Sequence, residues 1–320
     1  MRLKALAACI LPCLAATLAV AAAPQAAPSM EDARSMFAQA NAMLVDTRNS
    51  NVDQVTEMLE QAAPVYIPAA YKLLDVYEGR FKGLPEQPEK AVALARSLAE
   101  RDDEGNPLSA SLRPNAMFLL AGFLERGYGC EPNVLQAVQW LKRAAEAGLD
   151  EAKVELARCI MLGKGVKQNE RLAWKMLMDV ARRAPDTPKV YYYLGYMCYK
   201  GLGHRVDPYN AARLFREGVK HGDAACMNNL GVMFEHGQGI HRNAQGAAEL
   251  YRRAAELGNR EASSNLQRLS FKENAKALQN AATPAGERIR NAVLRLVDSL
   301  PLAEPWPERL RKAVTGQDAS

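Results

Sequence analysis

Apolar positions recur along this chain at fixed distances from paired glycines. Each unit has a leucine nine residues before the second glycine of a G-x-G motif and an alanine eight residues after it. The leucines are Leu74, Leu120, Leu156, Leu194 and Leu230, and the alanines are Ala91, Ala137, Ala173, Ala211 and Ala247. The second glycines are Gly129, Gly165, Gly203 and Gly239, and Gly83 stands at this position in a variant unit where Phe81 replaces the first glycine. Successive leucines are 36 to 38 residues apart, except for one step of 46 that contains the polar insert "RDDEGNPLSASLRPN" at 101–115. The chain is therefore built from internal repeats.

Within each repeat the pattern predicts two helices joined by a glycine turn. Apolar residues on both sides of the turn follow helical spacing, and glycine supplies the positive φ angles that end a helix. A small residue follows each leucine of the clear repeats and allows a neighbouring helix to approach closely: Ala121, Ala157, Gly195 or Gly231. In three repeats a further glycine ends the second helix: Gly148, Gly222 or Gly258. Because one helical hairpin cannot bury its apolar face alone, we expect an all-α, right-handed superhelical solenoid of stacked repeats.

Two stretches carry this pattern most fully, "FLLAGFLERGYGCEPNVLQAVQWLKRAAEAGL" at 118–149 and "NNLGVMFEHGQGIHRNAQGAAELYRRAAELGN" at 228–259. Both resemble the Sel-one-like repeat (SLR), a glycine-marked relative of the tetratricopeptide repeat (TPR). The resemblance implies a repeat solenoid over 65–260, with a degenerate unit at 65–100 and clear units at 115–150, 151–188, 189–223 and 224–260. The second clear unit ends in "ARRAPDTP" where glycine is expected, so its last turn is predicted to be looser.

The first 30 residues are typical of an export signal. Arg2 and Lys4 precede an apolar run of small residues, and Ala19-Val20-Ala21 offers an A-x-A cleavage site. We therefore predict a signal peptide at 1–21 and a linker at 22–30, which places the protein in the periplasm or outside the cell. Two alternatives are an uncleaved membrane anchor, since the run approaches the roughly 20 residues that span a bilayer, and lipidation at Cys9, which has few residues before it.

The segments that flank the repeats are predicted to be helical caps. At 31–64, "EDARSMFAQANAML" and "VDQVTEMLEQAA" are expected to form a helical hairpin. At 261–320, "EASSNLQRLSFKENAKALQ" begins another first helix with Leu266 in register, and "GERIRNAVLRLVDSL" forms a further helix before a tail. Such caps cover the exposed ends of a repeat stack.

The charge and the reactive side chains exclude several function classes. The formal charge is only +5, and its 41 basic residues are interleaved with 36 acids, which is too weak and scattered for nucleic-acid binding. Four histidines lie mainly at turns without the companions of a zinc site: His204, His221, His236 and His241. No nucleophile elbow, H-E-x-x-H motif or phosphate loop occurs. We therefore expect no metal, no cofactor and no enzymatic activity.

Four cysteines follow the leader: Cys130, Cys159, Cys198 and Cys226. An even number in an exported protein raises the question of disulfides. Cys159 and Cys198 occupy nearly equivalent positions in adjacent repeats, which makes them the one pair to consider. The alternative is that all four are free thiols in the helix packing.

The remaining candidate site is a surface. In repeats similar to these the first helices line a concave groove, through positions −5, −2, +2, +5 and +6 relative to the leucine. In the stretch "KVYYYLGYMCYKG" these positions select Lys189, Tyr192, Tyr196, Tyr199 and Lys200, and neighbouring repeats add Val154, Arg158, Met161, Asn228, Val232 and Glu235. Tyrosine is frequent at protein interfaces because it joins a large apolar face to a polar tip. The alternative is that these tyrosines pack between helices, the role predicted for Tyr191 and Tyr193.

These observations together predict a periplasmic scaffold or adaptor that binds a protein partner through its groove. The resemblance extends to proteins of envelope export, signalling and motor assembly. Membrane contact is expected only through that partner or through lipidation. The alternative function is an envelope enzyme or a peptidoglycan-binding module, which a clustered pair of acids in the groove would favour.

Overall fold

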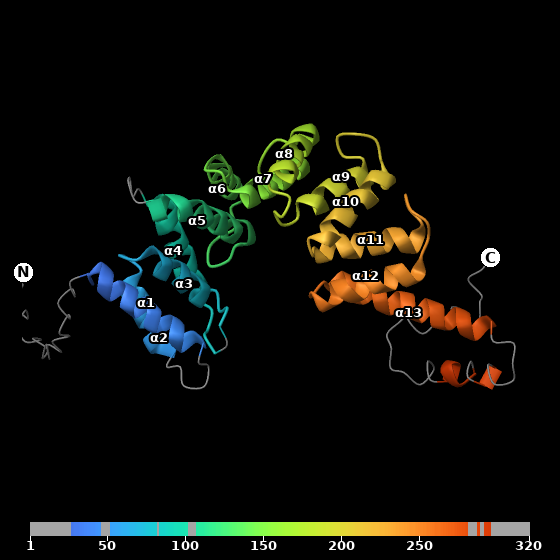
Figure 1. Ribbon diagram of the computed structural model, residues 1–320, viewed down its shortest axis with the longest axis horizontal. Helices are drawn as coiled ribbons and strands as arrows, with labels where there is room; N and C mark the ends of the chain where they lie inside the picture. The colour runs from blue at the N-terminus through green and yellow to red at the C-terminus, as the bar shows by residue number, and fades with distance from the viewer. Residues whose placement is uncertain are drawn as a thin grey trace, which may run out of the picture. The chain divides into compact units, whose positions relative to one another are not determined.

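The structure is a computed structural model that describes residues 27–45, 52–81, 83–101, 107–280, 287–288 and 291–295, and all the regular elements in these ranges are helices (Figure 1). The predicted signal peptide and Cys9 lie outside the described residues. The chain divides into two compact units, Met1–Leu94 and Ala95–Ser320, and each is described by itself.

The first unit contains the predicted N-terminal hairpin and the first helix of the degenerate repeat. Its helices are α1 (Met30–Val45), α2 (Val52–Ala62), α3 (Ile67–Tyr77) and the start of α4 (Pro88–Glu100). α1 packs on α2, and α2 packs on α3. A reciprocal cap begins α1, because Ser29 Oγ accepts from the Asp32 backbone N–H at 3.1 Å while the Asp32 carboxylate accepts from Ser29 N at 3.3 Å.

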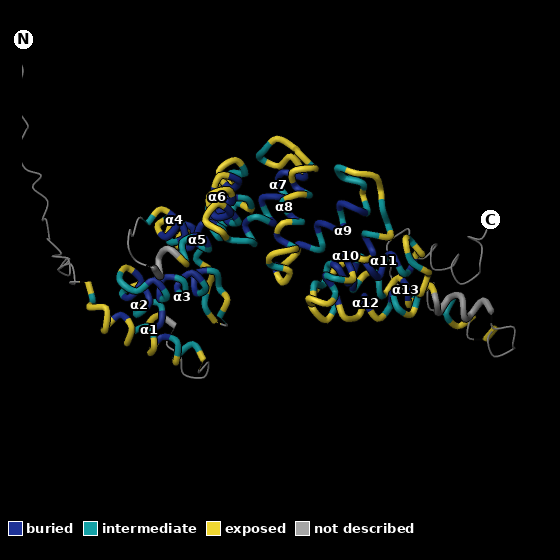
Figure 2. Tube along the Cα trace, turned by 45° about the horizontal axis from the view of Figure 1, so that its top comes forward, coloured by how far each residue is buried: buried dark blue, intermediate teal, exposed yellow. Residues whose placement is uncertain are grey.

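The second unit is a series of helix pairs, each packed on the next (Figure 1). First helices alternate with second helices in the order α5 (Pro107–Arg126), α6 (Val134–Glu146), α7 (Asp150–Leu162), α8 (Glu170–Arg183), α9 (Val190–Lys200), α10 (Pro208–Lys220), α11 (Ala224–His236), α12 (Ala244–Glu256) and α13 (Arg260–Asn280). Leu120 and Leu194 are fully buried. Figure 2 shows buried residues where α9 to α12 meet and exposed residues along the outer edge of α12. The predicted solenoid of helix-turn-helix repeats is confirmed.

The turn between the two helices of a repeat has the same construction each time. Both glycines of every G-x-G have positive φ, for example 69° at Gly163 and at Gly165. The second helix then begins at an asparagine or aspartate whose side chain accepts the N–H three residues on: Asn133, Asn169, Asp207 and Asn243. The backbone N–H of the same residue returns to a carbonyl of the first helix, as from Asn169 to Ile160 O at 2.9 Å. Glycine and cap together fix the angle of the hairpin.

The small residue after each leucine matches the size of a side chain on the second helix. A Cβ at Gly195 would lie 2.6 Å from the ring of Phe215, and a Cβ at Gly231 would lie 2.7 Å from the ring of Tyr251. In the two preceding repeats alanine stands at this position and leucine replaces the ring, as at Ala157 and Leu177. Glycine therefore accompanies the aromatic residue because only glycine leaves room for it.

We expect Gly231→Ala to lower the free energy of unfolding by about 1–2 kcal/mol, because the new methyl group collides with the buried Tyr251 ring. The matched control is Gly122→Ala on α5, where a Cβ would meet its nearest atom, on Arg126, at 4.0 Å. There alanine should raise stability by up to about 1 kcal/mol, since glycine is unfavourable inside a helix. Urea denaturation measures both. Equal stabilisation by the two changes would contradict the size match.

The structure adds two features at the repeat boundaries. The polar insert at 101–115 is partly helical, because α5 starts at Pro107 and continues through Pro114, whose missing N–H costs one helical bond. Arg113 Nε donates to Ala99 O at 3.1 Å and ties this extension to the end of α4. At the second clear repeat, the glycine-free connection 184–189 places Lys189 at a φ of 62°. Lysine takes the left-handed conformation that glycine adopts elsewhere.

The described part of the C-terminal segment begins with a long helix. α13 continues the register as another first helix, with Ala262 and Leu269 buried. Leu266, the residue predicted to be in the leucine column, is only half-buried. Residues 287–288 and 291–295 are helical within the further predicted helix, and the rest of that segment lies outside the described residues.

Candidate functional site

Adjacent first helices contact each other through two positions of the repeat. The residue five after one leucine meets the residue two after the next leucine. Arg158 Nη2 on α7 donates to both carboxylate oxygens of Glu125 on α5, at 2.8 and 2.7 Å. The same positions hold Glu235 on α11 and Arg268 on α13, joined by two parallel hydrogen bonds of 2.6 Å. Charge-assisted pairs of this geometry are among the strong hydrogen bonds of proteins.

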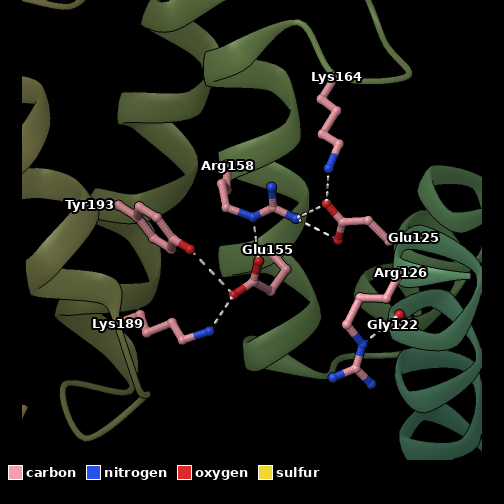
Figure 3. A network of polar contacts seen from close by, with 8 residues as sticks. All are labelled: Gly122, Glu125, Arg126, Glu155, Arg158, Lys164, Lys189 and Tyr193. Atoms are coloured by element: carbon pink, nitrogen blue, oxygen red, sulfur yellow. Dashed lines mark hydrogen bonds and ion pairs between the residues drawn. The ribbon is translucent and has the colours of Figure 1, made fainter. Parts of the chain in front are cut away.

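A continuous charged network surrounds the first of these pairs (Figure 3). Lys164 Nζ donates to Glu125 at 2.6 Å, and Arg158 Nε donates to Glu155 at 2.5 Å. Glu155 also accepts from Lys189 Nζ at 3.1 Å. The charged network, Glu125, Glu155, Arg158, Lys164 and Lys189, thus joins α5, α7 and the start of α9. It contains three cations and two carboxylates.

Hydrogen bonding in this network favours the ordinary charge states. Burial alone would raise the pKa of Glu125, but hydrogen bonds from Lys164 and Arg158 outweigh it and hold that pKa below its usual range. Burial, reinforced by Glu155, raises the pKa of Tyr193 above its usual range. A general acid needs a carboxyl pKa shifted upward, toward neutrality. Glu125 therefore has the properties of a carboxylate in a structural ion pair.

The second ion pair is more deeply buried at its acidic end. The side chain of Glu235 is 1% exposed, whereas that of Arg268 is 46% exposed. The hydroxyl of the buried Tyr251 donates a further hydrogen bond to Glu235 Oε2 at 3.0 Å. Hydrogen bonds from Arg268 lower the pKa of Glu235 despite its burial, with Tyr251 adding to the effect. This carboxylate links α11, α12 and α13.

Between the two ion pairs, α9 presents tyrosines. The rings of Tyr192 and Tyr196 stack with centroids 6.3 Å apart. Tyr199 donates from its hydroxyl to Gln238 Oε1 at 3.0 Å, and Lys200 Nζ lies 5.5 Å from the centre of the Tyr199 ring. The tyrosine face is defined as Tyr192, Tyr196, Tyr199 and Lys200. Its three rings are half-buried and Lys200 is exposed, so part of each ring is open to solvent.

The structure corrects the predicted groove at four residues. Val154, Met161, Asn228 and Glu235 are buried, with at most 4% of each residue exposed. They occupy the −2 and +5 positions, which face the neighbouring first helix rather than solvent. Asn228, for example, accepts from Asn265 Nδ2 on α13 at 2.9 Å. On α9 the same two positions hold Tyr192 and Tyr199. Their rings are larger, extend past the neighbouring first helix and stay half-buried.

The other predicted residues keep contact with solvent. Lys189 and Lys200 are exposed, while Arg158 and Val232 are half-buried. Tyr193 is buried, as expected of a packing residue. Tyr191 was also predicted to be a packing residue, but it is only half-buried. Its ring stacks on His221 with centroids 5.4 Å apart.

The cysteines and other potential ligands lie within the helix packing. Cys159, Cys198 and Cys226 are buried free thiols, and Cys130 is a half-buried free thiol. Burial raises the pKa of Cys198 to about 11, so this thiol is protonated at neutral pH and is a poor nucleophile. Across the described ranges, histidine, cysteine and acidic side chains form no cluster of three that could hold a metal ion. No helix in that part of the chain is long and apolar enough to cross a membrane.

The family model of the Sel1 repeat matches residues 68–103, 114–149, 150–177, 188–223 and 224–259, more than half of the chain. The chain belongs to the Sel1 repeat family. Sel1 repeats generally mediate protein–protein interactions, and proteins built from them are typically non-enzymatic. The third match stops at 177, inside α8 and before the glycine-free connection that follows this helix.

Two solved Sel1 repeat structures share the fold. A Sel1 repeat protein from Oxalobacter formigenes aligns with a TM-score of 0.56 and 19% identity over 79% of this chain and 91% of its own. A protective antigen of uropathogenic Escherichia coli that displays an SLR fold aligns with a TM-score of 0.55 and 19% identity over 92% of this chain. This Sel1 repeat protein spans 65% of the antigen's length. No curated protein matches the chain.

Sequence reasoning missed the ion pairs between Sel1 repeats, although the sequence contains their signal. Glutamate five residues after a repeat leucine is followed 33 residues later by arginine at both junctions, Glu125 with Arg158 and Glu235 with Arg268. A second repeating contact joins the residue five after a repeat leucine to the residue between the paired glycines of the next repeat. It links Glu125 with Lys164 and Tyr199 with Gln238. Both contacts follow directly from the repeat length.

Proposed function

We propose that this Sel1 repeat protein is an exported interaction scaffold that binds a protein partner in the periplasm through the tyrosine face. The observation that supports this most is the presence of three adjacent, half-exposed tyrosines on one first helix. Tyrosine and arginine are enriched among the residues that dominate binding energy at protein interfaces. Two exposed cations stand beside them, Lys200 in the tyrosine face and Lys189 in the charged network. A partner segment with an apolar surface and acidic residues at its edge complements this arrangement.

We expect Tyr196→Ala to weaken partner binding by about 1–2 kcal/mol while changing the free energy of unfolding by less than about 1 kcal/mol. The purified protein and this variant serve as baits in an envelope extract, and quantitative mass spectrometry compares the proteins that each retains. The dissociation constant of the best-retained partner is then measured for both baits.

The matched control is Tyr209→Ala on α10, a tyrosine that is 70% exposed outside the tyrosine face. Its partner retention should equal that of the unchanged protein. Equal retention by Tyr196→Ala and the unchanged protein would contradict the proposed site. Unfolding of Tyr196→Ala would assign that ring to packing instead.

Export rests on the predicted leader at 1–21. We expect the intact mass of the exported protein to correspond to a chain that starts near Ala22 and lacks Cys9. Lipidation would give a chain that starts at Cys9 with the added mass of the lipid. A mass that includes residues 1–21 would show an uncleaved segment and contradict the proposed periplasmic form.

A further inference from the structure

A cleft of about 750 Å³ opens between the second helices of two adjacent repeats, α8 and α10. We propose that this cleft binds a small amphipathic organic anion, a molecule with an apolar body and one acidic group. The site is distinct from the tyrosine face, and nothing in the repeat pattern assigns it. Its volume lies within the range of roughly 300–1,000 Å³ that is typical of small-molecule sites.

The cleft is lined by the two helices that flank the one irregular junction of the clear repeats. Elsewhere the chain passes from a second helix to the next first helix through short connections, 147–149, 221–223 and 257–259. Between α8 and α9 the connection is the longer, glycine-free segment 184–189. The cleft is lined by α8 and α9, the two helices that this connection joins, and by α10 and the turn at 204–207.

The inside of the cleft is apolar. Leu194, Cys198 and Leu214 form a buried floor. Trp174 and Met178 form a wall on α8, and both are half-buried, which leaves apolar surface accessible. The Trp174 ring meets His204 edge to face, with centroids 4.9 Å apart. An apolar body, such as a pair of fused rings or a medium-length acyl chain, would remove this surface from water.

The rim of the cleft is cationic. Arg182, Arg205 and Arg213 are exposed and line the cleft. In the described part of the chain the side chains of Arg182 and Arg205 make no hydrogen bond or ion pair, and Arg213 donates only to Asn210 Oδ1 at 3.3 Å. Guanidinium groups with unused donors suit a carboxylate or a sulfonate, which they can bind in a bidentate geometry.

Neither of the two acids at the rim forms an ion pair with these arginines in the described part of the chain. The Asp207 carboxylate caps α10 by accepting from Asn210 N at 3.0 Å and Asn210 Nδ2 at 2.5 Å. The Glu217 carboxylate accepts from Lys220 Nζ at 2.9 and 3.0 Å. The positive rim is therefore available to an anion whose body fills the apolar floor.

The test uses 8-anilinonaphthalene-1-sulfonate (ANS), an amphipathic anion, with the purified protein. We expect one equivalent to bind, with energy transfer from Trp174 to the probe. Arg182→Gln with Arg205→Gln should weaken ANS binding at least tenfold, because two charge-assisted contacts are lost. The matched control is Arg252→Gln with Arg253→Gln on α12, which makes the same charge change away from the cleft. It should alter the affinity less than twofold.

The neutral probe N-phenyl-1-naphthylamine has a closely similar ring system without the sulfonate. We expect it to bind at least tenfold more weakly than ANS and to be insensitive to the arginine changes. In the unchanged protein, octanoate should displace ANS whereas 1-octanol should not, a measurement that needs no variant. Equal binding of the two probes, equal loss in the two double variants, or displacement by the alcohol as readily as by the acid would each overturn the proposal.

Discussion

Leu194→Ala is expected to lower the free energy of unfolding by about 2–5 kcal/mol. Leu194 is fully buried on α9, in the leucine column that packs each repeat against its own second helix. Removing its side chain loses the burial of three carbon atoms and leaves a cavity that the surrounding helices refill only in part. In a stack where each repeat contacts only its neighbours, a defect in a central repeat also weakens its interfaces with the repeats on both sides.

The matched control is Leu135→Ala on α6, a leucine that is 66% exposed. The chemical change is identical, and alanine is at least as good a helix former, so stability should change by no more than about 0.5 kcal/mol. Urea denaturation followed by circular dichroism at 222 nm measures both. A similar loss for the two variants would show that the leucine column does not carry the core.

The fold was predictable because the signals that define it are local and repeated. The leucine column, the paired glycines with positive φ and the small residue at Gly195 or Gly231 each fix a contact within one hairpin. The helix cap was equally visible, since an asparagine or aspartate stands thirteen residues after each leucine of the clear repeats, from Asn133 to Asn243. One repeat supplies all of this information.

The candidate site was less predictable because it depends on contacts between repeats. The offset from the leucine gives the direction of a side chain around its own helix, but it does not say whether the next helix covers that direction. Val154 and Tyr192 share one offset, yet Val154 is buried and the larger ring of Tyr192 remains half-exposed. The cleft beside Trp174 lies between helices of two repeats, α8 with α9 and α10, and the connection 184–189 that joins α8 to α9 has no template in the neighbouring repeats.

Arg268→Ala is expected to lower the free energy of unfolding by about 3 kcal/mol at neutral pH. The change leaves the Glu235 carboxylate, 1% exposed, without its counter-charge. Breaking a buried ion pair in this way costs roughly 3–5 kcal/mol, and the lower end applies because the Arg268 side chain is itself 46% exposed and partly screened by water. Tyr251 then supplies the one remaining hydrogen bond to the Glu235 carboxylate that the structure shows.

The matched control is Arg252→Ala on α12. Arg252 is 53% exposed, close to the exposure of Arg268, and it also pairs with two carboxylate oxygens, from Glu249 and Glu256. Those acids are 53% and 61% exposed, so water replaces the lost partner and the cost should stay below about 1 kcal/mol. The two variants differ mainly in the burial of the acid. Equal losses would contradict a special role for the Glu235 pair.

The pH dependence of this loss separates the ion pair from simple packing. Arg268 lowers the pKa of folded Glu235 from its ordinary value of 4.5, so the stability due to the pair is fully present above that value. It disappears as the pH falls through the lower folded-state pKa, because protonated Glu235 no longer needs a counter-charge. The stability difference between the unchanged protein and Arg268→Ala should therefore be largest near pH 7 and shrink on acidification below about pH 4.5. A difference that stays constant from neutral to acidic pH would assign the loss to the packing of the arginine side chain on α13, with no contribution from its charge.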